Sequence, residues 1–548
     1  MGAKRLLIEN GRVWLPSGYV TEDTVLVEGD RIRALGDEAQ ELAAGAESLD
    51  ARGGSVLPGF QDGHVHPYHW ALRAMDCNLE EAADGQEVLD TIATFAAANP
   101  DRPWITGGGW AMSVFGGSMP TREMLDSVVP DRPAYFPYTD GHGAWVNSKA
   151  LEIAGIDDAT PDPFTGRIER DERGRATGML EELAMDLVAD RIPEPSEAVI
   201  DRAFERAYRR MIAWGLVGWQ DAMVGRTKNW VDNHAGYLRA VDSGLLRTHV
   251  VGALCWDPLR GLEQIPELIE QRERAWATAP FFSASAVKVF QDGVIENFTA
   301  GMFEPYLDAC GHTTENTGNS IVDPELLCEV VAELSRNGFQ VHMHALGDRA
   351  VHEALNAVEH SNRVNGDQDR RHTIAHIQVI DPVDIPRFAE LGVVANSQPL
   401  WARHEVEMDE MTTPYLGARR GRMQYPFGAL KGAGAVLAGG SDWPVTTADP
   451  IEIIHTAVTR SGSGAQGEER RPFLGEQALS LADAVRAHTE GVAYLNHDEE
   501  RSGSIEPGKA ADLVIMDRDL FDAPVSEIGD ASVRYTLLAG DVAYEHEV

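Results

Sequence analysis

The stretch FQVHMHALGD, residues 339–348, points to the fold class more directly than any other part of the chain. It is a short apolar run that stops at a glycine, which is typical of a buried strand and its turn. The segments before it (324–338, PELLCEVVAELSRNG) and after it (349–360, RAVHEALNAVEH) both repeat apolar residues at helical spacing. A strand between two helices indicates a β/α repeat, in which right-handed crossovers join parallel strands.

Seven further runs have the same character as residues 339–345. They are SVLPGF (55–60), LVGWQDA (216–222), THVVGAL (248–254), ASAVKVF (284–290), HTIAHIQ (372–378), VVANSQP (393–399) and AVLAGGSD (435–442). Helical patterns lie between most of these runs. Because eight strands are what a closed α/β barrel requires, the sequence predicts a (β/α)8 TIM barrel.

The two ends of the 548-residue chain predict a second domain. Both contain short apolar runs broken by turn signals, such as Asn10-Gly11 and Gly540-Asp541. Neither end is long enough to bury a core alone, so we expect residues 1–56 and 500–548 to form one composite β-sandwich. The barrel domain then covers residues 57–499, with an inserted cap subdomain at about residues 75–200, where the connection is too long for one crossover.

Composition excludes several function classes. The formal net charge of −40 is spread along the chain, which argues against a nucleic-acid partner and leaves open a salt-tolerant host. No apolar run approaches the ~18 residues of a membrane span and the start has no signal-peptide pattern, so we expect a cytoplasmic protein without a membrane partner. The four cysteines form no CxxC pair, which argues against disulfides and a thiolate zinc site. We expect a small-molecule substrate and a homodimer.

Histidines and one aspartate gather at the ends of the predicted strands. His64 and His66 follow the first barrel run, and alternate side chains of an extended segment share one face, so both imidazoles can reach one ion. The other candidates at such ends are the pair His342 and His344, then His376, and finally Asp442. Active sites of α/β barrels are built at the carboxyl ends of the strands, so this placement favours a metal site.

Lys288 lies within the apolar run of residues 284–290. A charged ammonium facing a barrel interior near a metal would be repelled and poorly solvated. As a neutral amine it can add to carbon dioxide and become an anionic carbamate that bridges two cations. The alternative interpretation is an ion pair with a carboxylate such as Asp292.

These features together resemble the amidohydrolase superfamily, specifically its branch of YtcJ-like proteins and N-substituted formamide deformylase (amidohydrolase family 3). The motifs that carry the resemblance are PGFQDGHVHP (58–67), DGHGAWVNSKALEIAGI (140–156), VKVFQDG (287–293), HALGDRAV (344–351), AGGSDWPV (438–445) and SIEPGKAADLVIMD (504–517). The resemblance implies metal or catalytic roles for His64, His66, His344, His376 and Asp442, with Lys288 as a carbamylated bridge. His342 does not match a ligand position of the family, and Ala375 stands where relatives commonly have glutamate.

The resemblance also implies an enzyme: a metal-dependent hydrolase with one or two divalent ions, zinc first, that cleaves a non-peptide carbon–nitrogen bond such as that of an N-substituted formamide. A metal-activated water would attack the carbonyl, and Asp442 would transfer the proton. Substrate contacts are expected from Trp110, His142, Asp292 and Trp443. The alternatives are hydrolysis of a cyclic amide or urea, deamination, metal-dependent decarboxylation, and, more remotely, a catalytically idle regulatory or binding protein.

Overall fold

Eight parallel strands form the centre of this computed structural model, which describes residues 4–16, 18–19, 23–116, 119–225, 232–366 and 368–546. In sheet order they are β8 (Phe60–Val65), β15 (Leu216–Val224), β16 (His249–Cys255), β17 (Phe282–Phe290), β18 (Gln340–Ala345), β19 (Thr373–His376), β20 (Val394–Ser397) and β21 (Leu437–Gly439). The last strand meets the first, because the amide of Asp442 donates to the carbonyl of His64. The predicted α/β barrel is confirmed.

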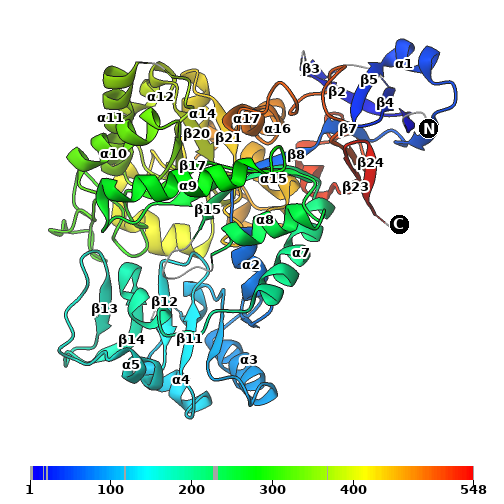
Figure 1. Cartoon of the computed structure of the whole chain (residues 1–548). Coiled ribbons are helices and arrows are strands. Elements are labelled where there is room, and N and C mark those ends of the chain that lie inside the picture. The colour runs from blue at the N-terminus through cyan, green and yellow to red at the C-terminus, as the bar shows by residue number, and fades with distance from the viewer. Residues whose placement is uncertain are drawn as a thin grey trace.

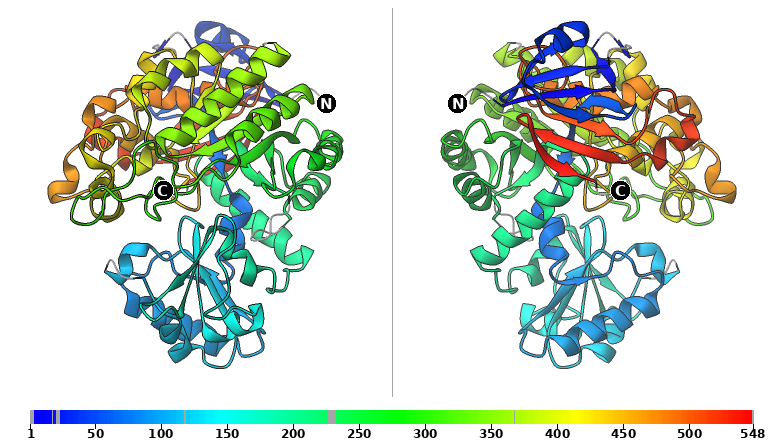
Figure 2. Two further views of the ribbon diagram at one scale, coloured as in Figure 1. Left: turned by 90° about the vertical axis from the view of Figure 1, so that its left-hand side faces the viewer. Right: turned by 90° about the vertical axis from the view of Figure 1, so that its right-hand side faces the viewer.

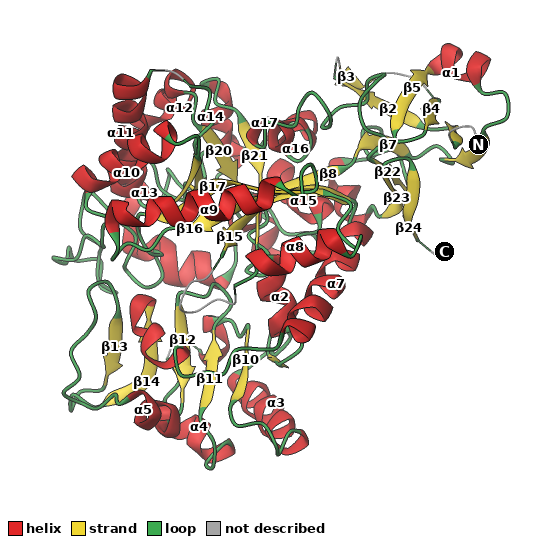
Figure 3. Ribbon diagram, in the orientation of Figure 1, coloured by secondary structure: helices red, strands yellow, loops and turns green. Residues whose placement is uncertain are grey.

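Helices surround the strands, as Figure 3 shows. They are α7 (Glu197–Ala213), α8 (His234–Asp242), α9 (Ile265–Trp276), α10 (Pro324–Arg336), α11 (Asp348–Asn365), α12 (Ile385–Leu391), α14 (Phe427–Gly432) and α15 (Pro450–Thr459). Each presents its apolar stripe to the outer face of the barrel. Within the described residues, no helix is both long and apolar enough to cross a bilayer.

The first predicted strand, residues 55–60, is divided between two sheets. Residues Ser55–Pro58 form β7 of the terminal sheet, and the barrel strand β8 begins only at Phe60. Gly59 makes the passage possible, since a Cβ on it would lie 2.4 Å from the Val217 side chain. The apolar run was therefore correctly predicted as β structure, but its two halves belong to different sheets.

Both chain ends meet in a pair of sheets, seen with the two termini in Figure 2. One has the order β5-β4-β1-β6: β5 (Arg31–Leu35), β4 (Val25–Glu28), β1 (Arg5–Glu9) and β6 (Glu47–Asp50). The other has the order β24-β23-β22-β7-β2-β3, which adds β24 (Asp541–Glu545), β23 (Val533–Leu538), β22 (Leu513–Met516), β2 (Arg12–Leu15) and β3 (Gly18–Tyr19). Ile8, Val56 and Leu537 are among the residues of the shared core.

A separate lobe between β8 and β15 lies beside the barrel in Figure 1. Its six-stranded sheet comprises β13 (Arg167–Arg170), β14 (Ala176–Glu181), β12 (Gly143–Val146), β11 (Ala134–Pro137), β10 (Ile105–Gly108) and β9 (Cys77–Asn78). Helices α3 (Gly85–Ala98), α4 (Arg122–Val128) and α5 (Ser148–Ala154) accompany this sheet. Trp110, Phe136 and Trp145 are fully buried inside this cap.

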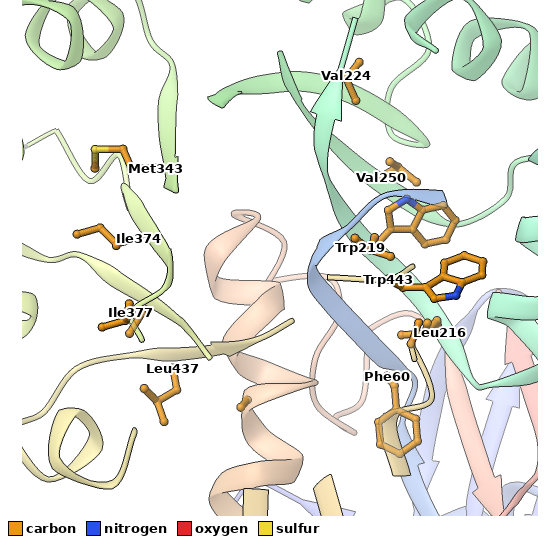
Figure 4. Packing of buried hydrophobic residues seen from close by; sticks show 14 of the residues in the cluster. Phe60, Leu216, Trp219, Val224, Val250, Met343, Ile374, Ile377, Leu437 and Trp443 are labelled. Carbon is orange, nitrogen blue, oxygen red and sulfur yellow. The ribbon is translucent and has the colours of Figure 1, made fainter. Parts of the chain in front are cut away.

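The large apolar side chains of the barrel belong mainly to one continuous core. Figure 4 shows part of that core, including Phe60, Leu216 and Trp219. Burying one such side chain contributes about 1.5–3 kcal/mol. Several buried polar side chains also come from the barrel strands, among them Gln220 of β15 and His342 of β18. The alternation of a strand thus provides an apolar shell and a polar interior.

Candidate metal centre

Three side chains converge at the carboxyl ends of β8 and β21. The Oδ1 atom of Asp442 lies 3.3 Å from His64 Nε2 and 3.2 Å from His66 Nε2. His64 occupies the end of β8, and His66 follows it directly. The three side chains are buried, and their ligand atoms all lie within 4.8 Å of one another. Two imidazoles and one carboxylate at this spacing are a donor set for a divalent cation.

His376 joins the cluster from the end of β19. Its Nδ1 lies 2.7 Å from Gln398 Oε1 and 3.9 Å from Asp442 Oδ2. The Gln398 amide is oriented by its own bond to Asn396 Oδ1, so it accepts a proton from His376 Nδ1. This leaves His376 Nε2 as a lone pair, and that buried atom has no hydrogen-bond partner among the described residues.

His344 lies at the end of β18, with its ring 4.5 Å from that of His376. Its Nδ1 is 3.2 Å from Oδ1 of the buried Asp292, which also accepts backbone N–H groups from Gly301, Leu346 and Gly347. Burial raises the pKa of the Asp292 carboxyl to about 7. Asp292 therefore lies behind His344 and connects it to two loops.

Two of the clustered residues have unusual backbone conformations. His376 has a φ of 77° and Asp442 has a φ of 58°. Both values lie in the left-handed region, which residues other than glycine rarely adopt. Residues in such regions cost about 1–3 kcal/mol each and concentrate at functional sites. The local strain turns each side chain toward the barrel mouth.

Lys288 lies close to this cluster without an ion pair to Asp292. Its Nζ is 3.5 Å from His64 Nε2 and 4.9 Å from the centroid of the Phe290 ring. Burial lowers the pKa of the Lys288 ammonium to about 8, although the charge of Asp442 opposes the shift. Asp292 is therefore not the ion-pair partner of Lys288, because its carboxylate accepts three backbone amides and lies 3.2 Å from His344 Nδ1.

The protonation of these groups fits a cation site. Burial, together with the charge of Lys288, holds the pKa of His64 well below its usual range, and burial does the same for His344 and His376. Burial raises the pKa of Asp442, but a hydrogen bond from His66 and the positive charge of Lys288 help to outweigh it and keep the carboxyl ionised. Neutral imidazoles beside a carboxylate are the forms that bind a metal.

The cap contributes a charged pair to the same region. His142 Nδ1 lies 3.1 Å from Glu182 Oε2, and the His142 ring is 5.4 Å from the ring of His344. Burial alone would lower the pKa of His142, but Glu182 outweighs it and raises the pKa to about 9. The loop keeps its shape because the His142 amide donates to Asp140. His142 is thus a cation that faces the cluster.

A cavity of about 620 Å³ connects the cluster with the cap. Its lining includes Lys288 and the three side chains of the Asp442 cluster from the barrel, and His142 and Glu182 from the cap. Apolar side chains such as Met223 and Trp256 form much of the remainder. The volume lies within the range of about 300–1,000 Å³ that is typical of small-molecule sites.

Three of the residues expected to contact a substrate lie behind this cavity. Trp110 is fully buried in the cap, where its Nε1 donates to the Phe136 carbonyl. Trp443 stacks on Trp70, with 4.7 Å between ring centroids. Neither indole lines the cavity, and Asp292 supports His344 instead. We therefore assign packing to the two tryptophans and positioning to Asp292.

His342 and Gln220 lie behind His64, although the sequence offered His342 only as a candidate metal ligand and gave Gln220 no role. His342 Nε2 lies 2.9 Å from His64 Nδ1, and His342 Nδ1 lies 2.5 Å from Gln220 Oε1. The alternation within HMH placed His342 and His344 on the same face, which was the only available signal.

Comparisons with known proteins agree with this arrangement. The model of the amidohydrolase family matches residues 47–544. Protein LONG AFTER FAR-RED 3 of Arabidopsis thaliana is 30% identical over 98% of this chain and 91% of its own length. N-substituted formamide deformylase of Arthrobacter pascens is 28% identical over 95% of this chain and 94% of its own length. The crystal structure of an uncharacterized metal-dependent hydrolase from Pyrococcus horikoshii has the same fold, with a TM-score of 0.73, 22% identity, and coverage of 95% of this chain and 99% of that one.

Proposed function

This chain belongs to the amidohydrolase family, and on that premise we propose that it is a metal-dependent hydrolase that cleaves the carbon–nitrogen bond of a small-molecule amide. The observation that carries the proposal is the convergence of His64, His66 and Asp442, with Lys288 beside them, on one wall of a cavity of substrate size. Side chains from distant parts of the chain meet at the end of the barrel where catalysis takes place in this fold.

The metal ligands in this proposal are His64, His66, His344, His376, Asp442 and a carbamylated Lys288. Imidazole and carboxylate ligands without thiolates favour zinc, with manganese, iron or cobalt as the other candidates. When bound, a divalent ion would polarise the scissile carbonyl and lower the pKa of an attacking water from 15.7 to about 7. The unpartnered Nε2 of His376 supports the presence of such an ion.

Asp442 would move the proton of the reaction. Its ionised carboxylate accepts a proton from the water that attacks the carbonyl, and the same proton then passes to the leaving nitrogen. The water gives its oxygen and one hydrogen to the new carboxylic acid, and its other hydrogen reaches the leaving nitrogen through Asp442. The amine and the acid are the products.

The cap supplies a charge for the developing oxyanion. Protonated His142 faces the cavity and is held by Glu182, so it can donate a hydrogen bond to the carbonyl oxygen as negative charge accumulates there. The apolar part of the lining suits an aliphatic or aromatic substituent on the amide. An N-substituted formamide is therefore the first substrate class to test, because the deformylase relative is named for it.

The lowered pKa of Lys288 supports carbamylation, because it increases the fraction of the neutral, nucleophilic amine. Its nitrogen would form a bond to the carbon of carbon dioxide and release one proton, which produces an anion that can bridge two ions. An environment that lowers the lysine pKa favours the nucleophilic form.

The test combines a metal assay with a substrate panel. The purified protein should contain one or two divalent ions per chain and hydrolyse formamides, acyl amines, cyclic amides or ureas. Release of ammonia from an aminated ring would indicate a deaminase, and release of carbon dioxide from a carboxylated aromatic would indicate a decarboxylase. A protein that takes up no divalent ion and turns over no substrate would contradict the proposal and favour a regulatory role.

A further inference from the structure

A row of buried amide and imidazole groups runs through the barrel behind His64. It passes from Gln340 through Gln220 and His342 to His64, and all four side chains are buried. Three barrel strands, β18, β15 and β8, contribute its members. None of Gln340, Gln220 and His342 lines the cavity that contains His64.

The direction of every hydrogen bond in this row follows from its far end. Gln340 Nε2 lies 2.8 Å from the carbonyl oxygen of Leu495 and 3.5 Å from that of Arg370, and carbonyl oxygens only accept. The amide nitrogen of Gln340 must therefore face them, which turns its Oε1 toward Gln220. Gln220 Nε2 donates to that oxygen over 2.7 Å.

The same reasoning determines which ring nitrogen carries the proton in His342 and in His64. Gln220 Oε1 faces His342 Nδ1 at 2.5 Å and can only accept, so His342 carries its proton on Nδ1. His342 Nε2 is then a lone pair, and it accepts the proton of His64 Nδ1 at 2.9 Å. His64 Nε2 is in turn left without a proton, 3.3 Å from Asp442 Oδ1 and 3.5 Å from Lys288 Nζ.

We propose that Gln340, Gln220 and His342 are positioning residues that fix the tautomer of His64, so that its Nε2 presents a permanent lone pair to the metal. The proposal rests on the proposed function, because it takes His64 as a ligand. The carbonyl groups of Leu495 and Arg370 determine the direction of the hydrogen bonds, and the side chains of Gln340, Gln220 and His342 carry that direction to His64. A histidine that is free to exchange tautomers would bind the ion only in one of its two neutral forms.

The first measurement is made on the parent protein without metal. Protein with isotope-labelled histidine is freed of metal, and nitrogen chemical shifts, assigned with histidine variants, report the tautomers of His64 and His342. Both residues should carry the proton on Nδ1. A proton on Nε2 of His64 would overturn the proposal.

The second measurement is the affinity for Zn²⁺, obtained by competition with a chromophoric chelator. His342→Leu removes the acceptor of His64 Nδ1 and should weaken binding about 10–100-fold, as loss of a partner behind a metal ligand usually does. His342→Gln keeps an acceptor and a donor on one amide and should retain most of the affinity. His372→Leu is the matched control, because His372 is equally buried but bonds to the Val341 amide.

The outcomes separate the two proposals. Equal losses in the leucine and glutamine variants, or no loss in either, would overturn the role of His342 as a positioning residue. If the parent protein takes up no Zn²⁺ while His64 carries its proton on Nδ1, the proposed function falls and the hydrogen-bonded row stands. Weaker binding only in His342→Leu, with His372→Leu equal to the parent, would support both.

Discussion

Asp442 combines an unusual backbone conformation with contacts to two histidines, so the chemistry should depend on it more than on any other carboxylate. Asp442→Asn keeps a ligand oxygen but cannot accept the proton of the attacking water. We expect the variant to retain its metal and to lose turnover by at least about 10³-fold. General acid–base catalysis usually contributes about 10²–10⁴-fold, and the changed charge beside the metal adds to the loss of the general base. Metal content and kcat, measured on the same preparation, test this.

Asp449→Asn is a control for that change, because Asp449 is a half-buried carboxylate that caps α15 and does not line the cavity. It should leave kcat near the parent value. Near-native turnover in Asp442→Asn would rule out the proton-transfer role of Asp442.

At the residue scale, strand position could be predicted but side-chain surroundings could not. Histidines at strand ends were identifiable because the period of a strand and the geometry of a barrel determine where they meet. The role of Trp110 could not be predicted, since a buried indole and a cavity-lining indole look alike in one sequence. The role of His342 depends on Gln220, which is 122 positions away along the chain.

At the level of elements, the turn between β18 and α11 holds the loop after β17 in place. A Cβ on Gly347 would lie 2.1 Å from the carbonyl oxygen of Gly301, and both glycines donate their amides to Asp292. Gly347→Ala should therefore push the two loops apart, cost about 1–3 kcal/mol of unfolding free energy and weaken Zn²⁺ binding through His344. Denaturant unfolding and the chelator competition measure the two effects.

Gly432→Ala provides the comparison for that substitution. Gly432 lies in helix α14, and a Cβ there would meet nothing within 4 Å. The alanine should be neutral or stabilising, by up to about 1 kcal/mol, because glycine is a poor helix former. A Gly347→Ala protein as stable as this control, with unchanged metal affinity, would refute the proposed coupling of the loops.

An acid-sensitive contact joins β16 to the segment that follows helix α17, which covers Glu490–Leu495. Asp498 lies 2.8 Å from Arg501 Nη2 and 3.4 Å from His249 Nδ1. Burial raises the pKa of Asp498, but these partners outweigh it and hold the pKa below the usual 3.8. A carboxyl with a lowered pKa contributes stability that is present above pH 3.8 and is lost as the pH falls through the folded value.

Asp498→Asn should consequently cost about 1.5–3 kcal/mol of unfolding free energy at pH 7, the value of hydrogen bonds to charged groups. The difference from the parent should shrink once the pH falls below 3.8. Urea unfolding at both pH values, with the exposed Asp101→Asn as a control, measures it. A cost that stays constant across this range would mean that the charge of Asp498 contributes nothing.

The eight strands show how far element prediction from sequence extends. Apolar runs such as residues 284–290 were identifiable because strands buried on both faces are continuously hydrophobic. The run of residues 55–60 was assigned to one element, whereas the chain changes sheets at Gly59. Hydrophobicity reports that a segment is buried but does not report in which sheet, because that depends on the Val217 contact from a distant part of the chain.

For the whole molecule, a bound ion should act as a cross-link, because its proposed ligands come from β8, β17, β18, β19 and the turn after β21. An ion that binds only the folded state stabilises it by about 4 kcal/mol at a free concentration one thousand times its dissociation constant. Removal of metal with a chelator should therefore abolish turnover and lower the unfolding midpoint by several degrees, and Zn²⁺ should restore both. His64→Asn should show a low midpoint that no longer responds to the chelator, since the site has lost a ligand. If the midpoint of the metal-free parent equals that of the metal-loaded protein, the strands hold their arrangement without an ion, and the cluster at the barrel mouth is not the cation site described above.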